Sequence, residues 1–278
     1  MDKTIKVGLL GCGTVGGGVL LVLQKNKEII AKKTGCPIEI KTVLVRDKQK
    51  LKPEIKKFKI PVTEDPETIF NDPEIDVVVE LIGRVHPAKE YIEAALRKGK
   101  SVVTANKDVL AEYGDELFAL AAEKKVDFQF EGAVGGGIPI IRPLRSCLAA
   151  NQISGIMGIV NGTTNYMLTR MSQEGLAYAD ALAEAQAKGY AEADPTADVE
   201  GLDAARKIAV LASLAFNTRL TLQDVHVEGI DNLDACDVAY ADDLGYAVKL
   251  LGIAKKHPEY GISANVYPVM LPKDHPLA

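Results

Sequence analysis

The chain has 278 residues, enough for two domains of average size, and 47% hydrophobic and 26% charged residues, as in an ordinary globular protein. Its net charge of −5, its aromatic content of 5% and its lack of tryptophan argue against a nucleic-acid-binding surface. No apolar run is long enough to cross a bilayer and no secretory signal precedes the first strand, so we expect a cytoplasmic protein without a membrane partner. The four cysteines are widely spaced without a C-x-x-C pair, which indicates free thiols.

Charge also differs between the two halves of the chain. Residues 1–134 contain 22 Lys and Arg against 21 Asp and Glu, whereas residues 135–278 contain 11 against 17. The first half is therefore the better host for phosphate groups, and the second half is better suited to a cationic ligand.

The first predicted elements are a buried strand over Ile5–Leu10 and a helix that follows a glycine-rich turn. The turn has the spacing G-x-G-x-x-G, in which successive glycines allow a tight turn, close approach of a pyrophosphate to the backbone, and close packing of helix on strand. In this strand-turn-helix context it predicts a dinucleotide site, although a turn that only packs would look the same. The residues assigned to the cofactor here are Gly11, Gly13, Thr14, Val15 and Gly16.

The second predicted strand covers residues 38–45 and ends at Arg46, where a dinucleotide-binding fold contacts the adenosine ribose. An acidic residue at this position favours NAD, whereas an arginine can bind a 2′-phosphate. Asp47 follows one residue later, so Arg46 favours NADP and NAD stays the alternative. The lysines beyond Asp47 are also explained as a solvated loop.

Further strands are predicted at residues 76–81, 101–104 and 126–130, with helices at about 87–98 and 108–124 between them. This alternation predicts an α/β domain with a Rossmann-type, doubly wound parallel sheet. Ligand-binding residues then belong just beyond the carboxyl ends of the strands. The candidates at these positions are Ile82, Gly83, Thr104, Asn106 and Lys107.

An acidic segment over residues 189–207 leads directly into the apolar run IAVLASLAF. Asp203 and Lys207 are four residues apart, on one face of a helix predicted to begin near Glu200. A small zwitterion would fit between such charges, while an ordinary surface ion pair and a helix cap are the alternative. The other acids of the segment are Glu192, Asp194 and Asp198.

Six blocks of the chain resemble the homoserine dehydrogenase family, in family order. They are GCGTVG (11–16), ELIG (80–83), VTANK (103–107), EGAVGGGIPII (131–141), NGTTNYML (161–168) and GYAEADPTADVEGLDAARKIAVLASLAF (189–216). The resemblance implies reversible, NAD(P)H-dependent reduction of aspartate semialdehyde to homoserine. Two functional alternatives stay open: a chain that binds NADP and dimerises without turnover, and a reductase of another amino-acid semialdehyde.

The resemblance also implies roles for individual residues. Lys207 and Lys107 match the catalytic lysines, and an ammonium can stabilise and protonate the oxygen that becomes negative on hydride transfer. Glu192 matches the acid that holds the substrate amino group, and Asp198 and Asp203 match acids of the same pocket. We also assign Tyr190 and Thr163 to the substrate. Whether the threonines and Asn161 of NGTTNYML contact a ligand or only cap a helix stays open.

In the family the EGAVGGGIPII block is a hinge that holds a monovalent cation, expected to be sodium. The oxygens that match the cation ligands belong to Glu131, Val134, Gly136 and Ile138. Carbonyl oxygens suit a hard cation, but a glycine-rich hinge without an ion accounts for the same residues.

We expect a dinucleotide-binding domain at 1–134 and, at 135–278, an α+β domain for substrate binding and homodimerisation. The sheet of the second domain is expected to use residues 153–160 and 262–271, with Pro268 at an edge or sheet boundary. Two features depart from the family. Arg84 replaces a usual glycine after ELIG, and the chain ends before a segment that completes the cofactor domain, so we expect a truncated chain.

Overall fold

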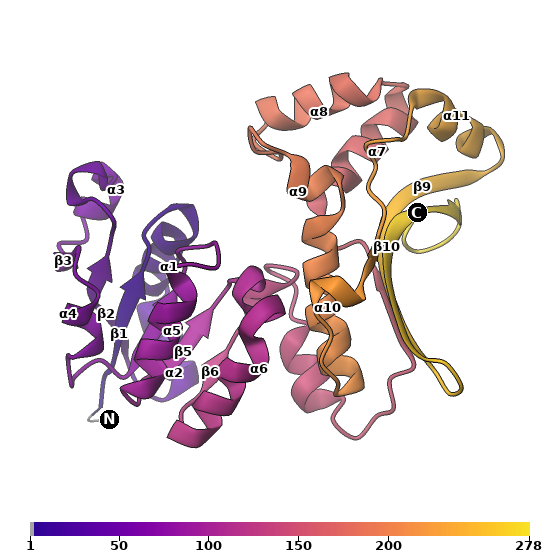
Figure 1. Ribbon diagram of the computed structural model, residues 1–278. Helices are drawn as coiled ribbons and strands as arrows, with labels where there is room; N and C mark the ends of the chain where they lie inside the picture. Colours follow the sequence, from indigo (N-terminus) through magenta and orange to yellow (C-terminus); the bar gives the residue numbers. More distant parts are fainter. Residues whose placement is uncertain (1–2) are drawn as a thin grey trace. The chain divides into compact units, whose positions relative to one another are not determined.

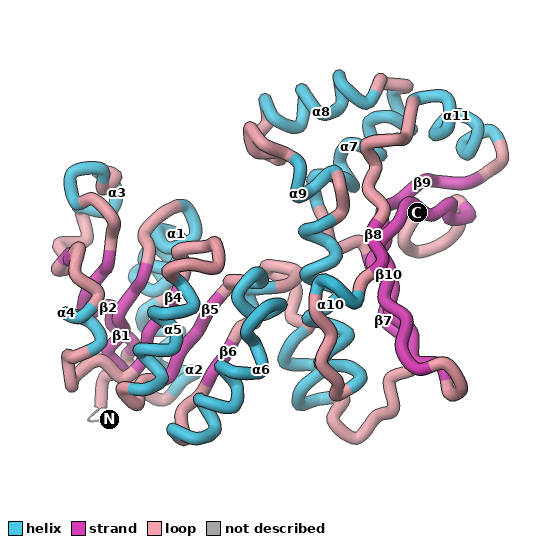
Figure 2. The backbone as a smooth tube through the Cα atoms, viewed as in Figure 1, coloured by secondary structure: helices cyan, strands magenta, loops and turns pink. Residues whose placement is uncertain are grey.

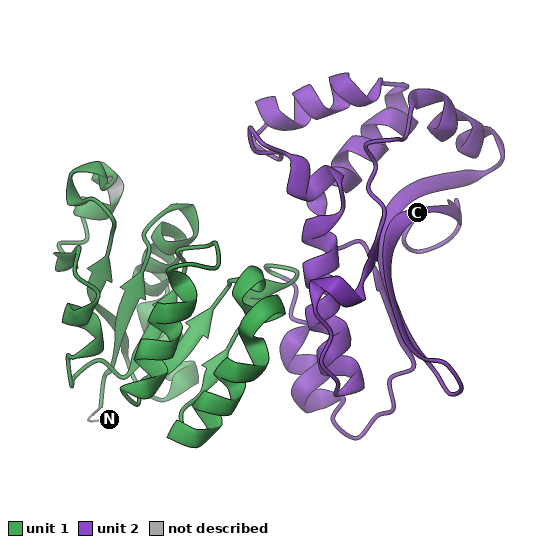
Figure 3. Ribbon diagram, in the orientation of Figure 1, with its two compact units in different colours: residues 1–137 green, residues 138–278 purple. Residues whose placement is uncertain are grey.

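The computed structural model describes residues 3–278 (Figure 1). The chain forms two compact units, Met1–Gly137 and Ile138–Ala278 (Figure 3). The division of roles predicted around residue 134 stays a prediction.

All four cysteines are free thiols. No helix within residues 3–278 combines the length and apolar character that a bilayer span requires.

The first unit is built on a six-stranded sheet in the order β3-β2-β1-β4-β5-β6 (Figure 2). Every neighbouring pair is parallel, and the strand order reverses between β1 and β4. The predicted Rossmann-type parallel sheet is therefore confirmed, and the reversal creates the position where such sheets bind ligands. The strands are β1 (Ile5–Leu10), β2 (Ile38–Leu44), β3 (Val62–Thr63), β4 (Val77–Glu80), β5 (Ser101–Thr104) and β6 (Phe128–Gln129).

Helices connect these strands, as the alternating pattern predicts. Apolar side chains of both element types are fully buried between sheet and helices, among them Leu9 of β1, Val78 of β4 and Ile92 of α5. The helices are α1 (Thr14–Lys25), α2 (Lys27–Thr34), α3 (Pro53–Lys56), α4 (Glu67–Phe70), α5 (Ala88–Arg97) and α6 (Lys107–Lys124), with short 3-10 turns η1 (Lys48–Lys50) and η2 (Glu131–Ala133).

The second unit contains a four-stranded mixed sheet in the order β7-β9-β10-β8. The long central strands β9 and β10 pair antiparallel along their whole length, while β7 pairs antiparallel with β9 and β8 pairs parallel with β10. The expected strands at 153–160 and 262–271 are present as β7 and β10. The strands are β7 (Gly155–Gly158), β8 (His226–Val227), β9 (Tyr246–His257) and β10 (Gly261–Pro272).

Pro268 lies in β10, which is an inner strand of the sheet rather than an edge strand. However, β8 pairs only with Asn265 and Val266, so β10 has already lost its second neighbour at Pro268. The proline therefore occupies a local edge, where its missing N–H removes no ladder hydrogen bond.

Five α-helices of residues 138–278 accompany this sheet. The central one, α10, buries a row of small side chains, including Ala205, Ala209 and Ala212, in a cluster that also contains residues of α7, α8, β9 and β10. Because alanine adds little bulk, α10 approaches its neighbours closely. The helices are α7 (Gly162–Glu174), α8 (Tyr178–Ala187), α9 (Thr196–Val199), α10 (Leu202–Phe216) and α11 (Ala235–Asp243), with a π-helical turn η3 (Pro143–Cys147) and a 3-10 turn η4 (Leu222–Asp224).

Candidate active site

The glycine-rich turn after β1 has the geometry of a dinucleotide-binding turn. Gly11 has φ +90°, and a Cβ there would lie 2.7 Å from the carbonyl oxygen of Leu81. A Cβ on Gly16 would lie 2.3 Å from the carbonyl oxygen of Gly11. In contrast, nothing lies within 4 Å of a Cβ built on Gly13. Packing thus requires glycine at the outer two positions, and the open middle position leaves room for a phosphate at the start of α1.

The first residues of α1 are accessible as well. Thr14 and Val15 open the helix, and Val15 is 61% exposed although it is apolar. Their positions fit the predicted contacts with a dinucleotide, whose phosphates favour the N-terminal end of a helix.

The end of β2 presents an exposed arginine beside an engaged aspartate. The Asp47 carboxylate accepts a hydrogen bond from the backbone N–H of Gln49 at 2.9 Å and also lies 3.5 Å from the Lys50 ammonium. Among residues 3–278, no ion pair engages Arg46. The acid at this strand end is thus used to cap η1, and the arginine is available to a ligand.

The ends of β4 and β5 are joined by a network of hydrogen bonds. The carboxylate of Glu80 accepts from the backbone N–H groups of Ile82 at 2.7 Å and Gly83 at 3.4 Å, and from the Thr104 hydroxyl at 2.6 Å. The Thr104 hydroxyl in turn accepts from the Asn106 backbone N–H at 3.0 Å. Our sequence reasoning did not select Glu80. The one available signal was an acid within an otherwise apolar predicted strand.

Asn106 closes this network and starts α6. Its side-chain amide donates to the Arg84 carbonyl oxygen at 2.7 Å, and its side-chain oxygen accepts from the Val109 backbone N–H at 3.2 Å. Lys107 follows as the first residue of α6. The predicted cofactor residues of both strand ends therefore lie in one connected structure, although the hydroxyl of Thr104 and the amide of Asn106 are already engaged within the protein.

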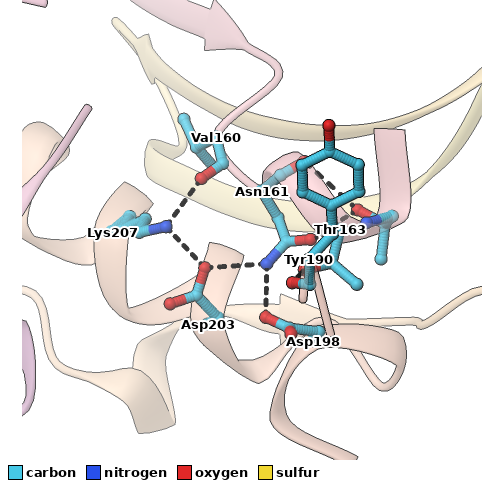
Figure 4. Close-up of polar contacts among 8 residues, drawn as sticks. Val160, Asn161, Thr163, Tyr190, Asp198, Asp203 and Lys207 are labelled. Atoms are coloured by element: carbon cyan, nitrogen blue, oxygen red, sulfur yellow. Dashed lines mark hydrogen bonds and ion pairs between the residues drawn. The ribbon is translucent and has the colours of Figure 1, made fainter. Parts of the chain in front are cut away.

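In the second unit, Asp203 and Lys207 form the predicted pair on α10 (Figure 4). The Lys207 ammonium donates to the Asp203 carboxylate at 2.6 Å and to the Val160 carbonyl oxygen at 2.9 Å. Asp203 is 7% exposed, so this pair is part of the protein interior rather than of a solvated helix face. The surface ion pair considered as an alternative is therefore wrong for these residues.

Asn161 connects the two carboxylates of this site. Its side-chain amide donates to Asp198 at 2.7 Å and to Asp203 at 2.9 Å (Figure 4). Its side-chain oxygen accepts from the backbone N–H of Thr164 at 2.8 Å and from the hydroxyl of Thr164 at 2.9 Å. Both ends of the amide are thus engaged within the protein, so Asn161 caps α7 and links the two acids, while a contact of Asn161 with a ligand stays a prediction.

Of the remaining predicted substrate residues, Thr163 and Tyr190 lie beside Asn161 (Figure 4). The Thr163 hydroxyl donates to the Tyr190 carbonyl oxygen at 2.8 Å, and the Tyr190 ring, which is 58% exposed, packs 4.8 Å from the ring of Tyr166. Glu192 is exposed, and within residues 3–278 no hydrogen bond or ion pair engages its carboxylate. Its charge is thus available to a cationic group from solution.

The predicted sodium ligands fall at the boundary of the units. Glu131 begins η2, Val134 follows it in extended conformation, and φ is +60° at Gly135 and +89° at Gly137. Among residues 3–278, no cluster of three His, Cys, Asp or Glu could hold a metal ion. Gly136 belongs to the first unit and Ile138 to the second, so a carbonyl-based sodium site here stays a prediction. Lys107 belongs to the first unit and Lys207 to the second, so the expected joint role of these two lysines in catalysis also stays a prediction.

Comparison with known proteins identifies the family. The family model described as homoserine dehydrogenase matches residues 139–278, and that described as homoserine dehydrogenase, NAD binding domain, matches residues 11–131. The chain belongs to the homoserine dehydrogenase family. It is 49% identical over 276 residues to the homoserine dehydrogenase of Bacillus subtilis strain 168, covering 99% of this chain and 63% of that protein.

Solved homoserine dehydrogenases have the same fold. The crystal structure of the Thiobacillus denitrificans protein matches with a TM-score of 0.94 at 48% identity, over 99% of this chain and 63% of that one. A hyperthermophilic archaeal homoserine dehydrogenase in complex with NADPH matches with a TM-score of 0.81 at 28% identity, over 99% of this chain and 84% of that one. The chain thus spans less than two thirds of the length of its first curated relatives.

Proposed function

We propose that this chain catalyses the reversible, NAD(P)H-dependent reduction of L-aspartate 4-semialdehyde to L-homoserine. The observation that carries the proposal is the Lys207–Asp203–Asn161–Asp198 network, in which one ammonium and two carboxylates surround the buried amide of Asn161. An amino-acid aldehyde needs both kinds of charge, since its ammonium is cationic and its reduced oxygen is anionic until protonated. Membership of the homoserine dehydrogenase family names the substrate.

The residues of the first unit fit a nicotinamide dinucleotide. Gly11, Gly13 and Gly16, with the N-terminus of α1, would hold the pyrophosphate, and the loops that follow β4 and β5 lie where the rest of the cofactor belongs. The exposed Arg46 supports NADP rather than NAD, because a guanidinium pairs well with the 2′-phosphate. When bound, the reduced cofactor supplies a hydride.

The residues of the second unit have complementary roles in the proposed reaction. The Lys207 ammonium donates a proton to the carbonyl oxygen of the aldehyde as that oxygen gains negative charge. Asp203 keeps Lys207 oriented through the bond of 2.6 Å. Asp198 and the exposed Glu192 attract the substrate ammonium, with Tyr190 and Thr163 at the rim. Lys107 is the second catalytic lysine of the proposal.

We also propose that the protein acts as a cytoplasmic homodimer formed through residues 135–278. Sedimentation equilibrium tests this assembly, and a monomer at assay concentration with full activity would contradict it. Sodium on the carbonyls of residues 131–138 is tested by replacing sodium with choline, which is too large for such a site. Unchanged melting temperature and activity would remove the ion from the proposal.

The deciding experiment follows NADPH oxidation at its absorbance maximum, with aspartate semialdehyde and, in a parallel assay, glutamate semialdehyde. We expect turnover with the four-carbon aldehyde and little with the longer one. Preference for the longer aldehyde would indicate a related reductase instead. NADPH binding without any turnover would mean that the chain is a binding protein.

A further inference from the structure

Glu80 is a buried acid that the proposed mechanism does not use. It is the last residue of β4, and its exposed fraction is 0%. Within residues 3–278 no lysine, arginine or histidine pairs with it, so only the three hydrogen bonds from Ile82, Gly83 and Thr104 compensate its removal from water. Burying a carboxylate is costly unless its hydrogen bonds are made well, so a purely packing role at this position would be served better by an apolar side chain.

Glu80 holds the loop of residues 81–84 that follows β4, here called the β4 loop, and this loop has an unusual backbone conformation. Gly83 and Arg84 both have positive φ, at +77° and +61°. Arginine rarely adopts this conformation, so contacts with other residues must hold the loop in it. The Glu80 carboxylate accepts from the backbone N–H of Ile82 at one end of the loop. At the other end, the Asn106 side-chain amide donates to the Arg84 carbonyl oxygen at 2.7 Å.

The same carboxylate reaches the second loop through Thr104. One carboxylate oxygen accepts from the β4 loop, and the other accepts from the Thr104 hydroxyl, which is itself bound to the Asn106 N–H. Asn106 then fixes the first turn of α6, where Lys107 is the first residue. The result is a closed ring of hydrogen bonds through Glu80, the β4 loop, Asn106 and Thr104.

We propose that Glu80 is a positioning residue that sets the β4 loop and the start of α6 relative to each other. It thereby fixes both the backbone offered to the dinucleotide and the position of Lys107. The parts of this inference that concern the dinucleotide and Lys107 rest on the proposed function. The ring itself belongs to the protein without any ligand.

Substitutions can open the ring without removing volume. In Glu80→Gln, the oxygen can still accept from the β4 loop, but the amide can only donate to the Thr104 oxygen, so the Thr104 hydroxyl loses its charged acceptor and this link of the ring is weakened. Thr104→Val deletes the hydroxyl, whereas Thr104→Ser keeps it. Glu67→Gln is the matched control, because Glu67 is exposed on α4 and, among residues 3–278, its carboxylate binds only the Asn71 amide at 2.8 Å.

We expect Glu80→Gln to raise the Kd of NADPH about 10-fold and to lower kcat by a similar factor, the scale of one charge-assisted hydrogen bond. The KM for homoserine should change less than about twofold, because the proposed substrate acids lie in the second unit. Thr104→Val should have a similar effect and the double variant little more, since both changes break one ring. Thr104→Ser should recover most of the loss, and Glu67→Gln should match the wild type.

Amide hydrogen exchange without cofactor gives a readout that does not depend on activity. Glu80→Gln should accelerate exchange at Asn106 about 10-fold, with the amides of β2 unchanged. Local acceleration together with the losses in Kd and kcat supports the proposal. Unchanged exchange at Asn106, or a lower melting temperature with unchanged Kd and kcat, overturns it. If the wild-type chain fails to bind NADPH, the proposed function fails, and the exchange result alone decides whether Glu80 positions the loops.

Discussion

Asn161→Ala is expected to lower the free energy of unfolding of the second unit by more than the loss of a helix cap alone. The substitution removes one amide that performs two tasks, capping α7 and donating to both Asp198 and Asp203. The amide is buried, with 4% of its residue surface exposed, so water cannot reach all the groups that it leaves behind. Lys207 loses nothing directly, but the Asp203 carboxylate that orients it loses one of its hydrogen bonds.

The size of the effect follows from these contacts. Loss of an asparagine cap costs about 1 kcal/mol. A hydrogen bond to a carboxylate contributes about 1.5 kcal/mol at the lower end of its usual range. We use this lower value because Asp198 is half-buried, so water can replace part of the lost hydrogen bonding. The free energy of unfolding should therefore fall by roughly 4 kcal/mol. For a unit of this size, the melting temperature should fall by roughly 10 °C.

Thermal unfolding followed by circular dichroism measures this loss. Asn161→Ser separates the two tasks, because serine still caps a helix but cannot bridge the carboxylates, so it should recover only about 1 kcal/mol. Asn232→Ala is the control, since Asn232 is exposed and, within the described part of the chain, its side chain reaches only its neighbour Asp231, at 3.5 Å. If Asn161→Ser restores full stability, the bridge to the acids contributes nothing and the reasoning fails.

Three further predictions concern single side chains. Lys207→Ala and Lys107→Ala should each lower kcat about 10²-fold, the contribution of a positioned acid or base, and near-wild-type turnover of Lys207→Ala would remove Lys207 from the mechanism. Arg46→Ala should weaken NADPH binding by about 1 to 3 kcal/mol and leave NADH binding unchanged in fluorescence titrations, whereas equal losses would make Arg46 structural. Burial lowers the pKa of Lys249, whose ammonium reaches two neutral oxygens of α7 at 3.1 Å each. The unfolded chain thus binds this proton more tightly, and stability should rise with pH toward the ordinary lysine value of 10.5, a rise that Lys249→Met should abolish in melting curves.

Elements with strong local signals could be predicted from the sequence. The strand-turn-helix at β1, the parallel strands β4 and β5, and the helices α5 and α6 have clear hydrophobic patterns and were expected close to their observed bounds. The two-residue strand β3 has no periodicity to detect and depends on pairing with β2. The strand β9 was also missed, since its continuous apolar run does not distinguish a buried strand from a buried helix.

For the site, spacing predicted the contact of Asp203 with Lys207, because four residues make one turn of a helix. The role of Asn161 could not be predicted, since its partners lie 37 and 42 residues away along the chain. Glu80 was missed for a similar reason, because its link to Thr104 spans 24 residues and exists only once β4 and β5 are paired. Long-range polar contacts of this kind follow from the tertiary fold, which motifs do not describe.

The prolines of β10 have a consequence for the behaviour of the protein in concentrated solution. The Val266 carbonyl accepts from the Glu228 N–H of the β8 side, so residues of the same parity, Pro268, Met270 and Pro272, direct their backbone groups to that side as well. β8 pairs with β10 only at Asn265 and Val266. Two of the three positions beyond it offer no N–H to an incoming strand. This stretch of β10 is thus a poor template for edge-to-edge aggregation, although a strand of 12 residues has the length that would otherwise invite it.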